Sequence, residues 1–358
     1  MGVKTMRILI TGNMGYIGPV LARHLRQRFP QAWLVGVDRG WFAHCLSDKR
    51  GLPEVVLDEQ WFRDVRDLTA QDLTGFDAVV HLAAVSNDAM GKRFETVTDQ
   101  INCQASLSVA RAAAEAGVKH FVFASSCSVY GAAADGTPRS ETSAIAPLTA
   151  YARSKIDTET GLAAMDTDMV ITALRFATAC GASPRLRLDL VLNDFVAGAV
   201  ASGKVEVLSD GTPWRPLIHV RDMSRAIEWA IQRPADTGGR YLFVNAGSER
   251  WNVQVRDLAH AVGAAIPTAE VTISTNAPAD SRSYRVDFSL FEKLAPDHQP
   301  IETLEGTIAE LRDELQRTAF SDRNFRQSGF IRLRILEGLV DSGQLLPDLR
   351  APELRAAA

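Results

Sequence analysis

The stretch Thr11-Gly12-Asn13-Met14-Gly15-Tyr16-Ile17-Gly18 decides the fold of this 358-residue chain. It follows a short apolar run at 7–11 and leads into residues 16–27, where apolar side chains recur at helical spacing. Glycine permits a tight turn at position 12, close approach of a phosphate group at 15, and close packing of the helix on the sheet at 18. We therefore expect a strand, a turn and a helix whose free N–H groups bind phosphates.

The next apolar run, at 33–38, ends in an acidic residue, Asp38. A carboxylate at this point can accept hydrogen bonds from the ribose hydroxyls of a dinucleotide. Its charge would repel the 2′-phosphate of NADP, so NAD is the expected cofactor. Arg39 follows directly and keeps NADP as the alternative, because a guanidinium can meet that phosphate. Asp64, beside Val65, is expected to hold the adenine, and the alternative is a helix cap before Leu68.

Strand-like and helix-like segments alternate through the first half of the chain. Apolar runs at 77–82, 121–124 and 170–174 are typical of buried strands, and 106–116 is typical of a helix. This pattern predicts an α/β fold with a Rossmann-type doubly wound parallel sheet. We expect a Rossmann domain over 1–180, to which 217–245 returns, and a smaller C-terminal α/β substrate lobe from 181–216 and 246–358. The helical tail at 330–349 is expected to pack on its own subunit, and a dimer contact is the alternative.

Composition limits the class of protein. The chain has 39 Lys and Arg against 43 Asp and Glu, and this mildly acidic balance argues against a nucleic-acid partner. Its four cysteines are scattered, with neither a zinc-ligand pattern nor a disulfide framework, so no metal is expected. No stretch reaches membrane-span length without charges, and the start lacks a signal-peptide pattern. We expect a cytoplasmic enzyme with no membrane partner.

A candidate catalytic pair lies in Tyr151-Ala152-Arg153-Ser154-Lys155. Residues four apart share one face of a helix, and a nearby ammonium favours the phenolate, so Tyr151 can act as a base. The pair follows a strand that ends in Ser125-Ser126-Cys127-Ser128-Val129-Tyr130-Gly131. Ligands of open α/β folds bind at the carboxyl ends of the strands, where a serine hydroxyl can bond the reacting oxygen.

The glycine turn, His81-Leu82-Ala83-Ala84, Ser-x-x-x-Tyr-Gly and Tyr-x-x-x-Lys together resemble the extended short-chain dehydrogenase/reductase family. Within that family the chain is similar to the NAD-dependent epimerase/dehydratase group that acts on nucleotide sugars. The resemblance implies that Tyr151 is base and acid, that Lys155 binds the nicotinamide ribose and lowers the tyrosine pKa, and that Ser126 orients the substrate oxygen. Ser125 and Ser128 are the alternatives to Ser126. The resemblance also implies a homodimer.

The expected binding residues follow from these motifs and from the resemblance. For the cofactor they are Gly12, Gly15, Tyr16, Ile17, Gly18, Asp38, Arg39, Asp64, Val65, Leu82, Ala83, Ala84, Asn102, Tyr151 and Lys155. For the substrate they are Ser86, Asn87, Ser128, Thr178, Asn193, Arg215, Asp280 and Arg282. Arg215 is the candidate for binding the nucleotide diphosphate, and the alternative is that it is a surface arginine. Arg185, Arg187 and Arg282 can compensate for diphosphate contacts that differ from those of the family. Asp88 is either a substrate contact or second acid/base, or part of a solvated loop.

The family's 4,6-dehydratases carry an acidic pair after the catalytic Ser or Thr. Here Cys127 and Ser128 occupy those positions, so we do not expect dehydration. The leading hypothesis is an NAD-dependent nucleotide-sugar epimerase that acts at C4 through a transient 4-keto intermediate. The first alternative is a nucleotide-sugar 4-ketoreductase or dehydrogenase with the same Ser-Tyr-Lys set. The second is a non-catalytic nucleotide-binding scaffold. The sequence leaves the base and the sugar open.

Overall fold

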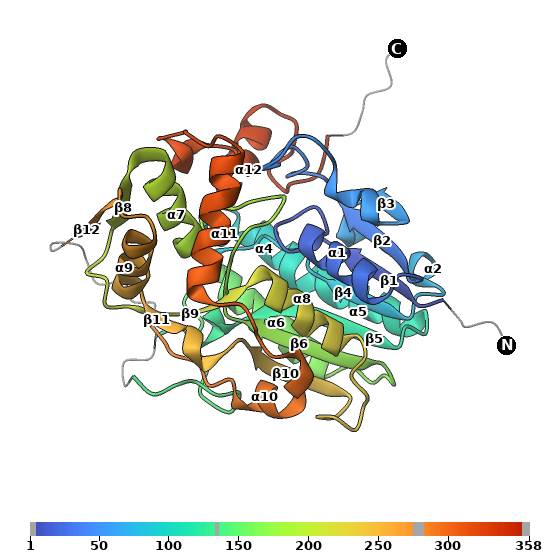
Figure 1. Cartoon of the computed structure of the whole chain (residues 1–358). Coiled ribbons are helices and arrows are strands. Elements are labelled where there is room, and N and C mark those ends of the chain that lie inside the picture. The colour runs from blue at the N-terminus through green and yellow to red at the C-terminus, as the bar shows by residue number, and fades with distance from the viewer. Residues whose placement is uncertain (1–4, 133–135, 275–282, 353–358) are drawn as a thin grey trace, which may run out of the picture.

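The computed structural model describes residues 5–132, 136–274 and 283–352 and is built around one large parallel sheet (Figure 1). Within this described part, seven strands pair in the order β10-β6-β5-β4-β1-β2-β3, each pair parallel. This confirms the predicted Rossmann-type doubly wound sheet. The strands are β1 (Arg7–Thr11), β2 (Trp33–Asp38), β3 (Glu59–Phe62), β4 (Ala78–His81), β5 (His120–Ser126), β6 (Val170–Phe176) and β10 (Tyr241–Ala246).

Helices cover both faces of this sheet because its strands are apolar on both sides. In β1, Ile8 and Ile10 point to one face and Leu9 to the other, as the two-residue period of a strand requires. The first face packs against α1 (Gly18–Arg28) and α8 (Val220–Ala230). The second face packs against α5 (Ser106–Glu115) and α6 (Ala150–Ala163), with α2 (Ala70–Leu73), α3 (Asp88–Arg93) and α4 (Glu95–Asp99) nearby.

A second lobe has its own apolar core, to which Leu192, Leu258 and Leu311 contribute. Its elements are α7 (Val191–Ser202), β8 (Lys204–Val207), α9 (Val255–Ala265), β12 (Glu270–Ile273) and α11 (Leu304–Arg317). A small sheet of β7 (Thr178–Cys180), β9 (Trp214–His219) and β11 (Asn252–Gln254) lies between this lobe and the large sheet. α10 (Ser289–Leu294) packs on β10. The division of the chain into two domains stays a prediction, while α8 and β10 do pack with the large sheet.

The C-terminal helix α12 (Arg332–Asp341) packs on its own chain. Leu336, Leu345 and Leu349 are buried in the same apolar cluster that Trp41 and Phe42 contact from the segment after β2. In Figure 1 this helix lies near the blue segment that follows β2. None of the helices in the described ranges is both long and apolar enough to cross a membrane.

β3 lies just before Asp64, where the sequence indicates a third strand without defining its bounds. Its residues, Glu-Gln-Trp-Phe, are partly exposed at the sheet edge, so they lack the apolar run of a buried strand. The helix expected at 16–27 begins at Gly18, because residues 12–17 form the turn. β5 continues past the expected 121–124 and ends at Ser126.

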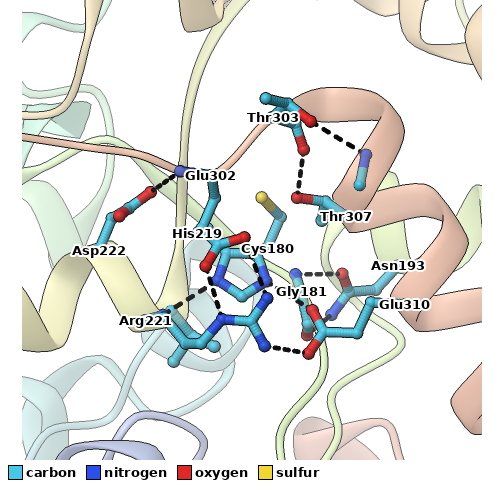
Figure 2. A network of polar contacts seen from close by, with 12 residues as sticks. Cys180, Gly181, Asn193, His219, Arg221, Asp222, Glu302, Thr303, Thr307 and Glu310 are labelled. Atoms are coloured by element: carbon cyan, nitrogen blue, oxygen red, sulfur yellow. Dashed lines mark hydrogen bonds and ion pairs between the residues drawn. The ribbon is translucent and has the colours of Figure 1, made fainter. Parts of the chain in front are cut away.

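A polar network joins the start of α8 to α11 (Figure 2). His219 lies 2.8 Å from Glu310, and Arg221 pairs with Glu302 at 2.7 Å and also with Glu310. Asp222 is 1% exposed and accepts hydrogen bonds from the backbone N–H groups of Ile301 (3.0 Å) and Glu302 (3.2 Å). The chain entering α11 is therefore held to the helix that follows β9.

We predict that Asp222→Ala lowers the free energy of unfolding by about 2–4 kcal/mol, because the N–H groups of Ile301 and Glu302 lose a buried carboxylate acceptor. Asp222→Asn retains one acceptor oxygen and should lose less. Asp313, which is exposed on α11, offers the matched control, and Asp313→Ala should change stability by less than about 0.5 kcal/mol. Urea unfolding followed by circular dichroism measures all three. Equal stability of Asp222→Ala and wild type would contradict this account of how α11 is held.

Candidate active site

A cavity of about 500 Å³ opens at the carboxyl ends of the central strands. Its lining brings together most of the residues expected from the sequence, although they are far apart along the chain. These are Gly12, Gly15, Tyr16, Ile17, Asp38, Arg39, Asp64, Val65, Leu82, Ala83, Ala84, Ser86, Asn87, Ser126, Ser128, Tyr151, Lys155, Thr178 and Arg215. Asp280 and Arg282 lie outside the described residues.

The glycine turn is shaped by close backbone contacts. Gly12 has φ +70°, and a Cβ there would lie 2.6 Å from the backbone nitrogen of Ala83. A Cβ on Gly18 would lie 2.0 Å from the carbonyl oxygen of Asn13. The close contact of Gly18 is therefore with Asn13 of the turn and not with the sheet. Gly18 does not line the cavity.

The turn and β2 offer the groups that a dinucleotide needs. Asp38 accepts hydrogen bonds from the backbone N–H groups of Met14 (3.0 Å) and Gly40 (2.7 Å), which fixes its carboxylate at the cavity wall. Burial raises the pKa of Asp38. The Nε of Arg39 and the Nε1 of Trp41 are buried donors without a protein partner in the described structure. α1 begins without a side-chain cap, but Pro19 has no N–H and the N–H of Val20 donates to the carbonyl of Ile17 at 3.1 Å, so phosphates can meet only N–H groups of the turn before Pro19. These groups fit a dinucleotide.

Asp64 is a helix cap at the cavity wall, and its contact with the adenine stays a prediction. It caps the short helical turn at 65–67 by accepting a hydrogen bond from the backbone N–H of Arg66 (2.9 Å), and it also lines the cavity. Burial by itself raises the pKa of Asp64, but the hydrogen bonds from Arg66 outweigh burial and the pKa is lowered. The carboxylate is therefore ionised when it faces the cavity.

Ser126, Tyr151 and Lys155 meet at the end of β5. Tyr151 and Ser126 line the same cavity, and the ammonium of Lys155 lies 5.5 Å from the centroid of the tyrosine ring. Lys155 is 3% exposed, and its Nζ donates to the carbonyl oxygen of Ala124 at 2.7 Å. Ser125, an alternative to Ser126, instead donates its hydroxyl to Glu159 at 2.5 Å. The Oγ of Ser128 is buried without a protein partner in the described structure.

The pKa values in this cluster differ from the simple expectation. Burial raises the pKa of Tyr151 to about 12, and the hydrogen bond from Ser126 lowers it only in part. Burial lowers the pKa of Lys155 to about 7. The expected lowering of the tyrosine pKa by Lys155 is therefore wrong for the cofactor-free protein, because loss of hydration disfavours both charged forms.

Neighbouring helices hold Tyr151 in place. Thr149 caps α6 by accepting from the N–H of Ala152 (3.1 Å), and it donates its hydroxyl to Asp88 at 2.6 Å. Asp88 lines the cavity at the start of α3. A Cβ on Gly91 would lie 3.1 Å from the Cβ of Tyr151, so α3 lies close against α6. Asp88 is therefore no part of a freely solvated loop.

Two asparagines expected to bind ligands are buried in the protein instead. Asn102 is 0% exposed; it accepts from the N–H of Val85 (2.8 Å) and donates to the carbonyl of the same residue (3.0 Å). Asn193 is also 0% exposed and donates to the carbonyl of Arg187 at 2.9 Å. Neither lines the cavity, because each amide is used to hold a loop that does.

His81 is satisfied by two hydroxyl groups. Its Nδ1 lies 2.9 Å from Thr11 Oγ1, and its Nε2 lies 2.9 Å from Ser106 Oγ. Burial lowers the pKa of His81 to about 3, so the ring is neutral.

The substrate side of the cavity contains a charged pair that the sequence did not single out as a pair. Arg187 and Asp189 are joined at 2.8 Å, and Asn87 donates to Asp189 at 2.8 Å. Arg187 also donates to the hydroxyl of Ser86 at 3.1 Å. Arg185, proposed as a compensating arginine, is 0% exposed and pairs with Glu54, so it does not line the cavity.

Other lining residues escaped sequence analysis altogether. Tyr284 and Arg332 belong to segments without a recognisable motif, yet both reach the cavity. The only sequence signal for Asp189 is the alternation Arg-x-Arg-x-Asp at 185–189 just before a helix.

We predict that Lys155→Met stabilises the cofactor-free protein more at low pH than at high pH. Between pH 7 and the ordinary pKa of lysine, the unfolded chain binds more protons, so wild-type stability rises with pH across this window. Below it the cost of burying the ammonium is fully present. The gain from Lys155→Met at about pH 6 should exceed that at about pH 9.5 by more than about 1.4 kcal/mol, the worth of one pKa unit.

Thermal and urea unfolding at the two pH values measure this difference. Lys119 is exposed and serves as the control, and Lys119→Met should show no such dependence on pH. A gain that is equal at both pH values would contradict the lowered pKa of Lys155.

A model of the NAD dependent epimerase/dehydratase family matches residues 8–247. The chain is 27% identical over 238 residues to the uncharacterized UDP-glucose epimerase YtcB of Bacillus subtilis, covering 64% of this chain and 73% of that protein. It is 26% identical over 262 residues to the UDP-glucose 4-epimerase of Corynebacterium glutamicum, covering 68% and 75% of the two chains.

Solved structures agree in fold. MoeE5 in complex with UDP-glucuronic acid and NAD superposes with a TM-score of 0.74 at 26% identity, covering 87% of this chain and 99% of that one. A UDP-glucose 4-epimerase from Stenotrophomonas maltophila superposes with a TM-score of 0.75 at 24% identity, covering 88% and 99%, which is a likeness of fold. The predicted resemblance, the enzyme class and NAD as cofactor are confirmed, and the chain belongs to the NAD-dependent epimerase/dehydratase family.

Proposed function

We propose that this enzyme is a nucleotide-sugar 4-epimerase that works through a transient 4-keto sugar. The observation that carries the proposal is that Ser126, Tyr151 and Lys155 line the same cavity as the glycine turn. An alcohol at C4 placed beside Tyr151 would thus lie within the cavity that holds the cofactor. The relatives named UDP-glucose 4-epimerase or UDP-glucose epimerase support this reaction class and make UDP-sugars the first substrates to test.

The residues that would hold the cofactor are those of the glycine turn, Asp38 and Lys155. NAD, when bound, supplies the site that accepts hydride from C4 and returns it. Asp38 offers its carboxylate to the ribose hydroxyls, and the turn offers N–H groups to the phosphates. Lys155 reaches the cavity from α6 with a charge that is only partly retained near pH 7.

Tyr151 moves the proton of the C4 hydroxyl in this proposal. Ser126 lines the cavity together with Tyr151, and its hydroxyl can bond the same sugar oxygen. Burial keeps the phenol protonated in the free protein, whereas the charge of Arg187 favours its phenolate. Tyr151 can therefore hold a proton at rest and release or accept it once positive charge is added nearby.

The segment after β2 (residues 39–58) supports an epimerase over a reductase or dehydrogenase, because it is positioned to retain the cofactor. Trp41 and Phe42 from this segment line the cavity. Farther along, the N–H of Ser47 donates to the carbonyl of Pro184 at 2.9 Å, and Glu54 pairs with buried Arg185. An epimerase regenerates its cofactor in each cycle and needs no release, whereas a reductase must exchange it.

The substrate side is consistent with a sugar diphosphate. Arg215 lines the cavity from β9, next to the end where Ser126 and Tyr151 meet Tyr284. A guanidinium can bond two phosphate oxygens at once, so Arg215 is our candidate for the nucleotide diphosphate. A cytoplasmic location and a homodimer stay predictions from the sequence.

We predict that Tyr151→Phe lowers kcat for 4-epimerisation by about 10²–10⁴-fold, because the proton of the C4 hydroxyl loses its acceptor. NAD binding should remain, since the phenyl ring is retained. The assay incubates the protein with UDP-, GDP-, CDP- and dTDP-sugars without added cofactor and detects C4 epimers by NMR. Tyr241→Phe, which changes a tyrosine that does not line the cavity, is the control.

Turnover only in proportion to added NADH or NADPH would instead assign the protein as a ketoreductase, and turnover in proportion to added NAD would assign a dehydrogenase. Ligand binding without turnover of any sugar, with Tyr151→Phe behaving as wild type, would assign a scaffold.

We predict that Glu54→Gln speeds loss of bound NAD by about 10-fold or more, because the buried charge of Arg185 loses its partner and the segment at 39–58 loosens. NAD remaining after repeated gel filtration is the readout. Glu305→Gln on the exposed face of α11 is the control. A further variant, Asp48→Asn, removes an exposed ion pair between the segment at 39–58 and Arg317. Unchanged retention in a folded Glu54→Gln protein would remove this support for an epimerase.

A further inference from the structure

The C-terminal helix α12 delivers a buried arginine to the cavity. Arg332 is 1% exposed and lines the cavity, and its guanidinium carbon lies 4.7 Å from the centroid of the Phe42 ring. α12 lies beside the blue segment after β2 in Figure 1, which agrees with this contact. Arg332 also lies outside residues 8–247, the span that the family model matches.

The charge of Arg332 is not paired with a carboxylate. Its Nη2 donates to the backbone carbonyls of Arg185 (2.9 Å) and Leu186 (3.3 Å), and its Nη1 reaches that of Gly329 at 3.4 Å. In the described part of the chain it forms no ion pair, and its Nε makes no hydrogen bond. The two nearby carboxylates are already paired, Glu54 with Arg185 and Asp189 with Arg187.

A second buried arginine shows what a purely structural role looks like. Arg233 is also 1% exposed, but it does not line the cavity. Its Nε donates to Thr172 at 2.9 Å, and both of its terminal nitrogens donate to backbone carbonyls. All of its nitrogens are therefore used inside the protein. Arg332 differs because part of its fork remains available at a cavity wall.

Burial lowers the pKa of Arg332 to about 10; the charges of Arg187 and Arg185 act in the same direction, and the charge of Asp189 opposes them in part. The side chain nevertheless stays cationic at neutral pH. An isolated cation in a poorly hydrated site is costly unless an anion compensates it. This supports the geometric argument that an anionic ligand completes the site.

A chain of hydrogen bonds connects Arg332 to the glycine turn. The hydroxyl of Ser183 donates to the carbonyl oxygen of Tyr16 at 2.6 Å, and the N–H of Arg185 donates to the same hydroxyl at 3.3 Å. Arg332 bonds the carbonyl of Arg185. Ser183 and Arg185 thus connect Arg332 to the turn. Arg332 and the turn line the same cavity.

We propose that Arg332 binds a diphosphate group in this cavity, from α12, and that the diphosphate is that of the dinucleotide cofactor. The guanidinium fork suits paired bonds to phosphate oxygens, and stacking on Phe42 holds its plane in one orientation. The diphosphate of a nucleotide sugar has the same chemistry and is the other possible source. The inference rests on the proposed function only in that the cavity must bind such a ligand.

The test measures ADP-ribose and UDP binding to cofactor-stripped protein by isothermal titration calorimetry. ADP-ribose carries the cofactor's diphosphate without its nicotinamide, and UDP carries that of a nucleotide sugar. We expect Arg332→Met to weaken ADP-ribose binding by about 10–100-fold while UDP binding changes less than about 2-fold. Arg332→Lys, which keeps the charge, should recover part of the loss. Arg334→Met removes an exposed arginine of the same helix and should match wild type.

Each other outcome has a defined meaning. Loss of UDP binding alone supports a diphosphate site and assigns it to the nucleotide sugar. Unchanged binding of both ligands in folded Arg332→Met, checked by circular dichroism, overturns the proposal. The proposal is also overturned if Arg332→Met and Arg332→Lys weaken the binding of ADP-ribose and of UDP to the same extent. Side-chain shape and not charge would then determine binding. If the Met variant does not fold, the Lys variant and Arg332→Gln provide the same comparison.

This test separates the present inference from the proposed reaction. A wild-type protein that binds ADP-ribose but epimerises no nucleotide sugar overturns the proposed function and leaves the role of Arg332 intact.

Discussion

The close packing of the turn after β1 is the constraint on which the rest of the site depends. The N–H of Gly12 donates to the carbonyl of Val37 at 2.8 Å, which ties the turn to β2. The backbone of Ala83 lies where a side chain at position 12 would be, which ties the turn to the end of β4. On the opposite side, the hydroxyl of Tyr16 donates to the carbonyl of Gly181 at 2.5 Å. One short segment thus joins the two strands that flank β1, β2 and β4, to the second lobe.

Loss of hydration is the dominant electrostatic effect around this cavity. It raises the pKa of Asp38 and Tyr151 and lowers that of Lys155, in each case by disfavouring the charged form. Charges that remain, such as Arg187 with Asp189, are kept by direct pairing. Arg332 has no direct carboxylate partner in the described part of the chain, although the charge of Asp189 favours its cationic form. A bound ligand that carries opposite charges would change the balance for all of these groups at once.

Much of the fold and part of the candidate site could be predicted from local patterns. The apolar runs indicated the inner strands because a strand covered on both faces must be apolar throughout, whereas the bounds of the partly exposed β3 could not be predicted. The residues at the strand ends were found because the carboxyl edge of a parallel sheet collects them. Asn102 and Asn193 were misjudged, since a motif position does not reveal whether an amide faces a cavity or a backbone carbonyl.

The sequence by itself determined the strand-turn-helix at 7–28 and the spacing of Tyr151 and Lys155 on one helix face. Both follow from interactions among residues that are close in the chain, such as steric limits at glycine and the 3.6-residue helical period. Only the tertiary structure decided which serine meets Tyr151, which arginines keep a free edge, and in which direction burial moves each pKa. These properties depend on neighbours far away in sequence, as Arg332 beside Phe42 and Arg185 shows, and on how completely the whole fold excludes water.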